Sequence, residues 1–424
     1  MRENIRVSRL PVGATVLTDV MEGVRSVTLG FFYRVGSRHE PDELNGITHF
    51  IEHTVFKGSE RRSALEIAIE QDRLGGALDA FTTHEETGFV IKVIDDQIEK
   101  AFDLLADMLT NPRFDEKELE NEQNVIIEEM KMVEDSPEEY LGEIFSEAFF
   151  PGHPLGLNIV GTPKTVKKFD PECTRRYQEK AFAPSNLIVA AAGNVEHSHI
   201  EELTRKYFGS KASSGADAKI TSPIPAMQSP IIIRQNKNLE QAHLIIATPF
   251  VSAIDERRYA ADLLANIIGG GTSSRLWQKV REERGLAYSV GASTIMFRDC
   301  GYFSVYAGTS PHQTEEVVDI TVKEIREIVK NGVTTDELEL AKQQARASIL
   351  LSLEDSASRA AALANSEMTY ERQISVEETL ANIDAVTVEE IGKLARKYFR
   401  TGNVAFAALG NLSELKISRD DLTI

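Results

Sequence analysis

The sequence predicts an α+β protein built from two similar halves, and three observations lead to this prediction. The chain has 424 residues, more than a single hydrophobic core usually organises. The segment 209–230 is rich in Ser, Ala, Gly and Pro, as linkers are, and it lies near the middle of the chain. Similar elements occur on both sides of it in the same order. We therefore expect an N-terminal domain 1–208, a linker 209–230 and a homologous C-terminal domain 231–424.

The predicted elements support this repeat. Residues 27–35 and 88–93 have the pattern of strands, and residues 301–306 are the counterpart of the second of these. Each half closes on a short apolar run that ends in Gly-Asn, at residues 186–194 and 403–411. Two amphipathic runs, at 98–109 and 118–133, predict helices. This order predicts, in each half, a largely antiparallel sheet with helices covering one face.

Composition limits the classes of partner. The chain is 42% hydrophobic and 27% charged, and no run approaches the roughly 18 apolar residues of a membrane helix. Its net charge of -19 disfavours nucleic acid and anionic membranes as partners. Residues 1–20 lack the features of a signal or transit peptide, so we expect a cytoplasmic protein of bacterial type, or an organellar matrix protein if a leader was removed. Cys173 and Cys300 are too few for a disulfide framework or a cysteine-type zinc site.

The strongest functional pattern is His49-Phe-Ile-Glu52-His53. On a helix, residues three and four apart share a face, so His49 and His53 could bind one metal ion with Glu52 beside them. This H-x-x-E-H order is that of the inverzincins, the reverse of H-E-x-x-H. The motif alone fits equally well two ordinary helix histidines and a surface glutamate.

The helix that carries this motif has further expected features. Asn45 or Thr48 could cap its N-terminus. Phe50 and Ile51 would point away from the metal and anchor the helix in the core.

A catalytic zinc site needs a third protein ligand and leaves its fourth position to water. The predicted helix 118–133 has an apolar stripe at Leu119, Ile126 and Met130. Glu122 and Glu129 share a face near this stripe, whereas Glu128 points roughly the other way. A carboxylate on a buried face is costly unless it is paired or bound to metal. Glu129 is therefore the predicted third ligand, and Glu122 the predicted partner that orients a ligand.

Two segments carry a specific resemblance, Gly46-Ile-Thr-His-Phe-Ile-Glu-His-Thr-Val-Phe-Lys-Gly58 and Leu119-Glu-Asn-Glu-Gln-Asn-Val-Ile-Ile-Glu-Glu-Met130. They resemble the pitrilysin/insulinase family of zinc peptidases, and especially its mitochondrial-processing-peptidase-like branch of short two-domain subunits. The spacing from His53 to Glu129 is the one that the family uses for its third ligand. Leu78-Asp-Ala-Phe-Thr-Thr83 is similar to the family's substrate-side strand. The resemblance covers essentially the whole chain.

The resemblance implies two homologous domains that face each other as half of a clam-shell chamber, the second without a metal site. Aligning His53 with Asn266 places Asp262 opposite His49, so the ligands are lost in the second half. Ala265 likewise falls opposite Glu52, and Ser348 opposite Glu129. We therefore expect one Zn²⁺ per chain.

The second half is also expected to contribute to catalysis. In the family, an Arg and a Tyr seven residues apart belong to the site, and Arg281 and Tyr288 have that spacing. Both could donate hydrogen bonds to a peptide carbonyl or to the oxyanion as it forms.

The expected activity is that of a zinc metalloendopeptidase acting on unfolded peptides or presequence-like segments. Glu52 would act as the catalytic base on a water activated by zinc. The strand Asp79, Ala80, Phe81 and Thr82 would hold the peptide extended by β-augmentation, although relatives often have Asn where Asp79 stands.

The expected protein partner is a second copy in a homodimer, or a non-catalytic paralogue in a heterodimer. Two other functions compete with the peptidase: a non-catalytic structural or chaperone-like subunit on the same fold, and a zinc hydrolase with a non-peptide substrate.

Overall fold

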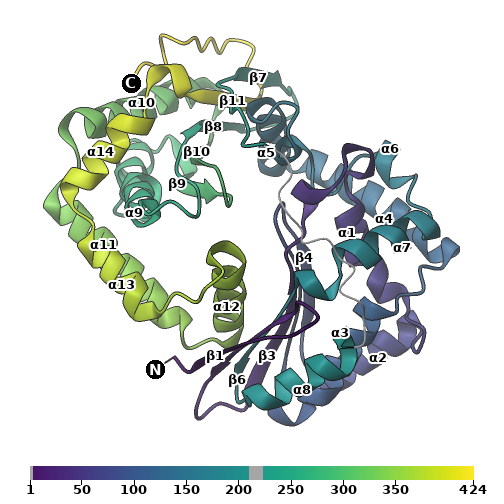
Figure 1. Ribbon diagram of the computed structural model, residues 1–424. Helices are drawn as coiled ribbons and strands as arrows, with labels where there is room; N and C mark the ends of the chain where they lie inside the picture. Colours follow the sequence, from purple (N-terminus) through teal and green to yellow (C-terminus); the bar gives the residue numbers. More distant parts are fainter. Residues whose placement is uncertain (1–2, 210–222) are drawn as a thin grey trace. The chain divides into compact units, whose positions relative to one another are not determined.

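The computed structural model describes residues 3–209 and 223–424 and has the α+β architecture expected from the sequence (Figure 1). The chain forms two compact units, each with its own sheet. The first unit comprises Met1–Met132, Leu157–Pro223 and Leu350–Ser375, and the second comprises Val133–Gly156, Ile224–Ile349 and Val376–Ile424. Most of the predicted linker 209–230 lies outside the described residues.

The sheet of the first unit has six strands in the order β1-β2-β6-β3-β5-β4. Only β2 and β6 pair in parallel, and the other pairs are antiparallel. The strands are β1 (Ile5–Arg9), β2 (Thr15–Val20), β3 (Ser26–Tyr33), β4 (Leu78–Thr82), β5 (Thr87–Ile94) and β6 (Leu187–Gly193).

The sheet of the second unit has five strands in the order β7-β11-β8-β10-β9. These strands are β7 (Ile231–Gln235), β8 (Ala242–Pro249), β9 (Ala287–Met296), β10 (Gly301–Thr309) and β11 (Ala405–Gly410). The order matches β2-β6-β3-β5-β4 of the first unit, and the one parallel pair, β7 with β11, falls at the equivalent place. The internal repeat expected from the sequence is thus present in the topology.

The helices follow the same repeat, since α1 lies between β3 and β4 in the chain and α9 lies between β8 and β9. In the first half they are α1 (Ile47–Thr54), α2 (Ala64–Leu74), α3 (Ile98–Thr110), α4 (Glu116–Asp135), α5 (Pro137–Phe149), α6 (Pro163–Val166), α7 (Pro171–Ala181) and α8 (His197–Phe208). In the second half they are α9 (Arg258–Gly269), α10 (Thr314–Asn331), α11 (Thr335–Ser352), α12 (Ser356–Tyr370), α13 (Val376–Ala385) and α14 (Val388–Tyr398). Within the described residues, no helix has both the length and the apolar character needed to cross a bilayer.

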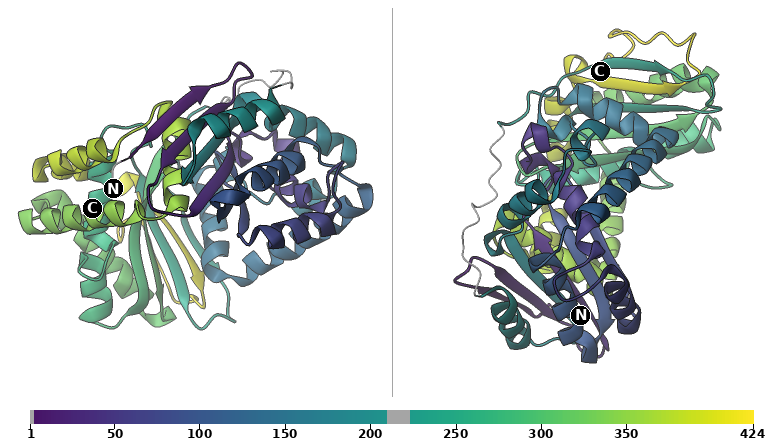
Figure 2. Two further views of the ribbon diagram at one scale, coloured as in Figure 1. Left: turned by 90° about the horizontal axis from the view of Figure 1, so that it is seen from below. Right: turned by 90° about the vertical axis from the view of Figure 1, so that its right-hand side faces the viewer.

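Each sheet is covered on both faces, which differs from the single covered face expected from the sequence. In the first unit, α3 and α8 lie side by side on one face, and α12 packs on β2, β3 and β6 (Figures 1 and 2). Neighbouring strand residues belong to different cores: Phe31 packs in the core with α3, and Phe32 packs with Leu363 and Ala364 of α12. In the second unit, α5 covers β8 and β11 in the same way.

The helices on these second faces come from the other half of the sequence. Helix α5 follows α4 in the chain but belongs to the second unit, and α12 follows α11 but belongs to the first. The compact units therefore differ from the contiguous domains 1–208 and 231–424 by an exchange of 133–156 and 350–375. The physical reason is burial: β6 is buried along its whole length, so both of its faces need a cover.

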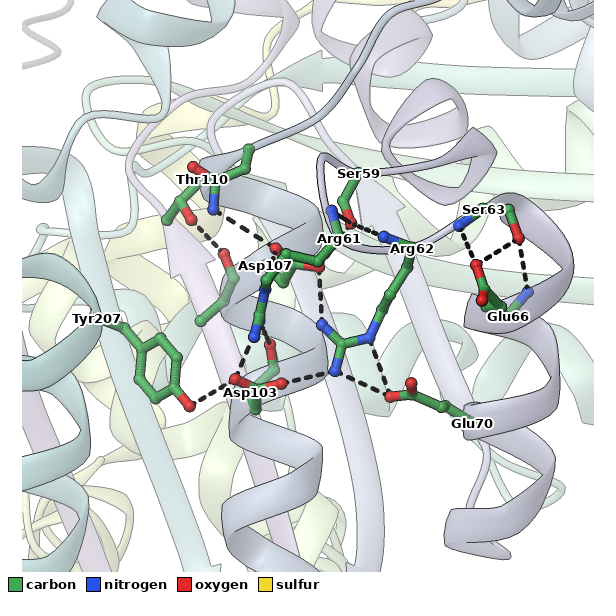
Figure 3. A network of polar contacts seen from close by, with 12 residues as sticks. Ser59, Arg61, Arg62, Ser63, Glu66, Glu70, Asp103, Asp107, Thr110 and Tyr207 are labelled. Atoms are coloured by element: carbon green, nitrogen blue, oxygen red, sulfur yellow. Dashed lines mark hydrogen bonds and ion pairs between the residues drawn. The ribbon is translucent and has the colours of Figure 1, made fainter.

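A polar network fixes the segment that follows α1 (Figure 3). Arg62 donates hydrogen bonds to Asp103 (2.6 Å) and Asp107 (2.7 Å) of α3, and Arg61 contacts the same two carboxylates. Tyr207 of α8 donates to Asp103 as well (2.6 Å). Burial opposes ionisation of Asp103, but the hydrogen bonds from Tyr207, Arg62 and Arg61 outweigh it and lower the pKa of this carboxyl to about 2.

Candidate metal centre

Helix α1 is anchored by its apolar residues, as the sequence predicts. Ile47, Phe50 and Ile51 are fully buried in the core of the first unit. The Phe50 ring lies 5.3 Å from the ring of Phe169, centroid to centroid. Because these residues fix the rotation of the helix, the positions of His49, Glu52 and His53 are set by packing.

The N-terminus of α1 differs from the prediction, because neither Asn45 nor Thr48 caps it. The capping position is Gly46, at φ 96°, and a side chain there would collide with Gly161. The buried Glu40 carboxylate replaces a side-chain cap by accepting hydrogen bonds from the backbone amides of Gly46 (2.7 Å) and Thr48 (2.8 Å). Burial raises the pKa of Glu40 to about 7.

The structure brings the three predicted ligands together. One potential ligand atom from each of His49, His53 and Glu129 lies within 4.8 Å of the others. Glu129 Oε2 is 3.8 Å from His49 Nε2 and 3.7 Å from His53 Nε2. No second group of three such side chains occurs in the part of the chain that the structure describes.

The polar atoms of this group fit a metal ion. Glu129 Oε2 is buried, yet it has no hydrogen-bond partner among the described residues. A buried oxygen without a partner is costly unless something else satisfies it. Zinc bonds of about 2.0–2.1 Å would place tetrahedral ligand atoms about 3.4 Å apart, close to the spacing between Glu129 and the two imidazoles.

Charge and burial shift the pKa values of the two histidines in opposite directions. Burial, with the charge of His53 adding to it, lowers the pKa of His49 to about 3, so this imidazole is neutral, the form that binds metals. At His53, burial alone would lower the pKa. The hydrogen bond with Glu122 and the charges of Glu52 and Glu129 have a larger opposite effect, so the pKa of His53 is raised overall.

Glu122, the residue predicted to orient a ligand, lies in contact with His53. Glu122 is 5% exposed, and its Oε2 lies 3.3 Å from His53 Nδ1. Such carboxylate–histidine contacts fix the ring and its tautomer, which leaves the other nitrogen free to bind metal. The sequence reasoning missed Lys57, whose Nζ lies 2.8 Å from Glu122 Oε1. Lys57 follows His53 by four residues, which is a usable signal for a shared helical face.

Glu52 lies beside the ligands and contacts the strand that was predicted to bind substrate. Its carboxylate accepts a 2.6 Å hydrogen bond from the Thr82 hydroxyl. Burial raises the pKa of Glu52 in spite of this hydrogen bond. Asp79, Ala80, Phe81 and Thr82 all belong to β4, whose one neighbour in the sheet is β5. β4 is therefore an edge strand that packs on α1.

Arg281 and Tyr288 lie together in the second unit. The Arg281 guanidinium donates a 2.9 Å hydrogen bond to the Tyr288 backbone carbonyl and lies 4.7 Å from the centroid of the Tyr288 ring. It also lies 4.1 Å from the Trp277 ring centroid. The Tyr288 side chain is 78% exposed in the chain as described. The two residues thus form one surface cluster that offers hydrogen-bond donors.

Comparison with known proteins shows the family to which the chain is related. Residues 15–163 match the insulinase family (peptidase family M16), and residues 168–345 match its inactive domain. An uncharacterised zinc protease of Streptomyces coelicolor is 36% identical over 98% of this chain and 91% of its own length. One of Bacillus subtilis is also 36% identical, over 91% of this chain and 94% of its own length.

Solved structures share the fold. A protease from Helicobacter pylori superposes with a TM-score of 0.89 at 21% identity, covering 97% of this chain and 100% of that one. A peptidase M16 inactive domain from Pseudomonas fluorescens gives the same TM-score and identity and covers 98% of this chain and 100% of that one. Identity to the two bacterial zinc proteases over most of both lengths shows that the chain belongs to the insulinase family of peptidases, peptidase family M16.

Proposed function

We propose that the chain is a zinc-dependent endopeptidase that cleaves unfolded peptides, with one zinc ion held by His49, His53 and Glu129. The observation that carries the proposal is the meeting of two imidazoles of α1 with a carboxylate of α4, whose buried oxygen has no partner among the described residues. The similarity to relatives named as zinc proteases supports it.

The chain's own residues would carry the proton transfers. Zinc, when bound, would supply a Lewis acid that activates a water molecule and polarises the scissile carbonyl. Glu52 would take the proton from the attacking water and pass it to the leaving amine. Burial raises the pKa of Glu52 above its usual value, which is the direction that makes a carboxylate a stronger base.

The edge strand β4 would hold the substrate. Because β5 is its one neighbour in the sheet, the outer edge of Asp79–Thr82 has backbone groups available to pair with an extended peptide. This mode recognises backbone more than side chains, so unfolded peptides of many sequences are the expected substrate class. Arg281 and Tyr288 would donate hydrogen bonds to the peptide carbonyl or to the oxyanion.

Self-association belongs to the same proposal. From the family resemblance we propose a homodimer, with a heterodimer containing a non-catalytic paralogue as the variant. Light scattering after size-exclusion chromatography would give a mass of twice 47.1 kDa for the homodimer.

The test compares the wild type with Glu52→Gln on a set of unstructured fluorogenic peptides. The proposal predicts cleavage by the wild type, loss of cleavage in Glu52→Gln with zinc retained, and loss of cleavage when a chelator removes zinc from the wild type. Retained cleavage in Glu52→Gln would contradict the role of the base. A zinc-loaded wild type that cleaves no peptide would contradict the peptidase and favour the non-catalytic subunit.

A further inference from the structure

The strand β4 and the helix α1 are joined by one short hydrogen bond. Thr82, the last residue of β4, donates its hydroxyl to Glu52 Oε2 at 2.6 Å. A hydroxyl bonded to an ionised carboxylate at this distance is among the stronger hydrogen bonds in proteins. The residues that the structure describes make no other hydrogen bond to the Glu52 carboxylate. One carboxylate oxygen is therefore fixed, and the other remains available to a water molecule.

The second unit contains a similar bond with a different acceptor. Thr294 of the edge strand β9 donates its hydroxyl to Asp262 of α9, the helix that corresponds to α1. Asp262 falls opposite His49 in the alignment of the two halves, one helical turn before the position of Glu52. Both units therefore have a hydrogen bond from the edge strand of the sheet to the corresponding helix. The acceptor is the glutamate of the H-x-x-E-H motif in the first unit alone.

The acceptor decides what the bond can do. In the described part of the second unit no three potential metal ligands come together, so the bond between Thr294 and Asp262 has a structural effect. In the first unit the same kind of bond orients Glu52, which is 9% exposed and lies next to His53. A catalytic group displaced by about 1 Å can cost on the order of 100-fold in rate.

We propose that Thr82 is a positioning residue that holds Glu52 in place for proton transfer. The inference rests on the proposed function, and it gives Thr82 a role different from the substrate contact expected from the sequence. Because Thr82 also belongs to the edge strand proposed to hold the peptide, the bond fixes the base relative to the backbone of the substrate.

The experiment uses three variants of the full chain. Thr82→Val keeps the shape and removes the hydroxyl, Thr82→Ser keeps the hydroxyl, and Thr294→Val removes the corresponding bond of the second unit. For each, kcat and KM on one unstructured peptide are measured together with zinc content. We expect kcat to fall 10- to 100-fold in Thr82→Val, with KM within about twofold of the wild type and zinc unchanged. Thr82→Ser should restore most of kcat, and Thr294→Val should leave it unchanged.

A second readout needs no activity. Melting temperatures of the metal-free wild type, Thr82→Val, Glu52→Leu (which removes the acceptor) and the double variant form a double-mutant cycle. The two changes should shift the melting temperature non-additively, because both break the same bond.

Three outcomes would overturn the inference. They are a Thr82→Val enzyme with wild-type kcat, a loss of kcat that Thr82→Ser does not restore, and an equal loss in Thr294→Val. Each of these leaves the proposed function intact, because the wild type cleaves. A zinc-loaded wild type without cleavage contradicts the proposed function, and this inference with it.

Discussion

Replacing Glu122 by Gln tests the architecture around the metal ligands without any substrate. The variant keeps the size of the side chain and removes its negative charge, which faces His53 Nδ1 at 3.3 Å and Lys57 Nζ at 2.8 Å. Burial alone would raise the pKa of Glu122. The hydrogen bonds with His53 and Lys57 have a larger opposite effect and lower the pKa overall, so the native group is an anion at neutral pH. The charge that makes the His53 imidazole a better ligand is therefore lost in the variant.

The expected loss of zinc affinity follows from the contact between Glu122 and His53. Carboxylates that orient a metal-bound histidine are typically worth a factor of 10–100 in metal affinity. At about 1.4 kcal/mol for each tenfold change, the variant should lose about 1.4–2.8 kcal/mol of zinc-binding free energy. The unpaired Lys57 ammonium adds to the loss, because a positive charge close to the site opposes binding of a cation.

The assay is a zinc competition against a chromophoric chelator at neutral pH, with circular dichroism to confirm folding. Glu120→Gln is the matched control, because Glu120 lies on the same helix and is exposed. The control should bind zinc as the wild type does. A Glu122→Gln variant with wild-type zinc affinity would refute the reasoning, because the contact with His53 would then contribute nothing to binding.

Two further predictions concern stability. Arg359→Met should destabilise the first unit by about 3–5 kcal/mol in urea unfolding, because it leaves the buried carboxylate of Asp19 without its 2.6 Å partner. Lys92→Met, which breaks an exposed ion pair to the turn before the same helix, should cost about 0–1 kcal/mol. Equal losses would contradict the argument that burial makes the Asp19–Arg359 pair the more important of the two. Asp103→Asn should destabilise at neutral pH by about 2 kcal/mol. The pKa of Asp103 is lowered from 3.8 to about 2, so this stabilisation is present above about pH 4 and is lost as the pH falls toward 2. A difference between wild type and Asp103→Asn that stays constant from pH 6 to about pH 3 would contradict the role of the network.

The candidate metal centre could be predicted because its residues lie at fixed spacings within two short stretches of sequence. The spacing of His49, Glu52 and His53 defines one face of a helix whatever the rest of the fold does. The expected placement of Glu129 followed from the spacing of Glu122 and Glu129 on an amphipathic helix, and in the structure the carboxylates of both lie beside the histidines. Lys57 could have been found by the same argument.

Other features of the site depend on contacts that no local pattern contains. The cap of α1 comes from Glu40, which is separated from the helix by a short 3₁₀ helix (Asp42–Leu44), so Asn45 and Thr48 were the natural but incorrect candidates. The bond from Thr82 to Glu52 depends on how β4 packs on α1, which alternation along the strand does not determine.

The repeat was predictable, but the exchange of helices between the units was not. The succession of strands and helices along each half follows from similar segments that recur in the same order on both sides of the linker. The continuous apolar character of β6 does indicate burial on both faces. It does not identify which helix covers the second face, because α5 and α12 have unremarkable amphipathic patterns and pack on sheets formed by the other half of the chain.

The most direct test of the central claim is the zinc content of the purified chain. Metal analysis of the wild type, Glu52→Gln and Glu129→Gln separates ligand from base, with circular dichroism to confirm that each is folded. We expect about one zinc per chain in the wild type and in Glu52→Gln, and a marked loss in Glu129→Gln. A folded wild type that binds no zinc, or a Glu129→Gln variant that keeps it with wild-type affinity, would contradict the account.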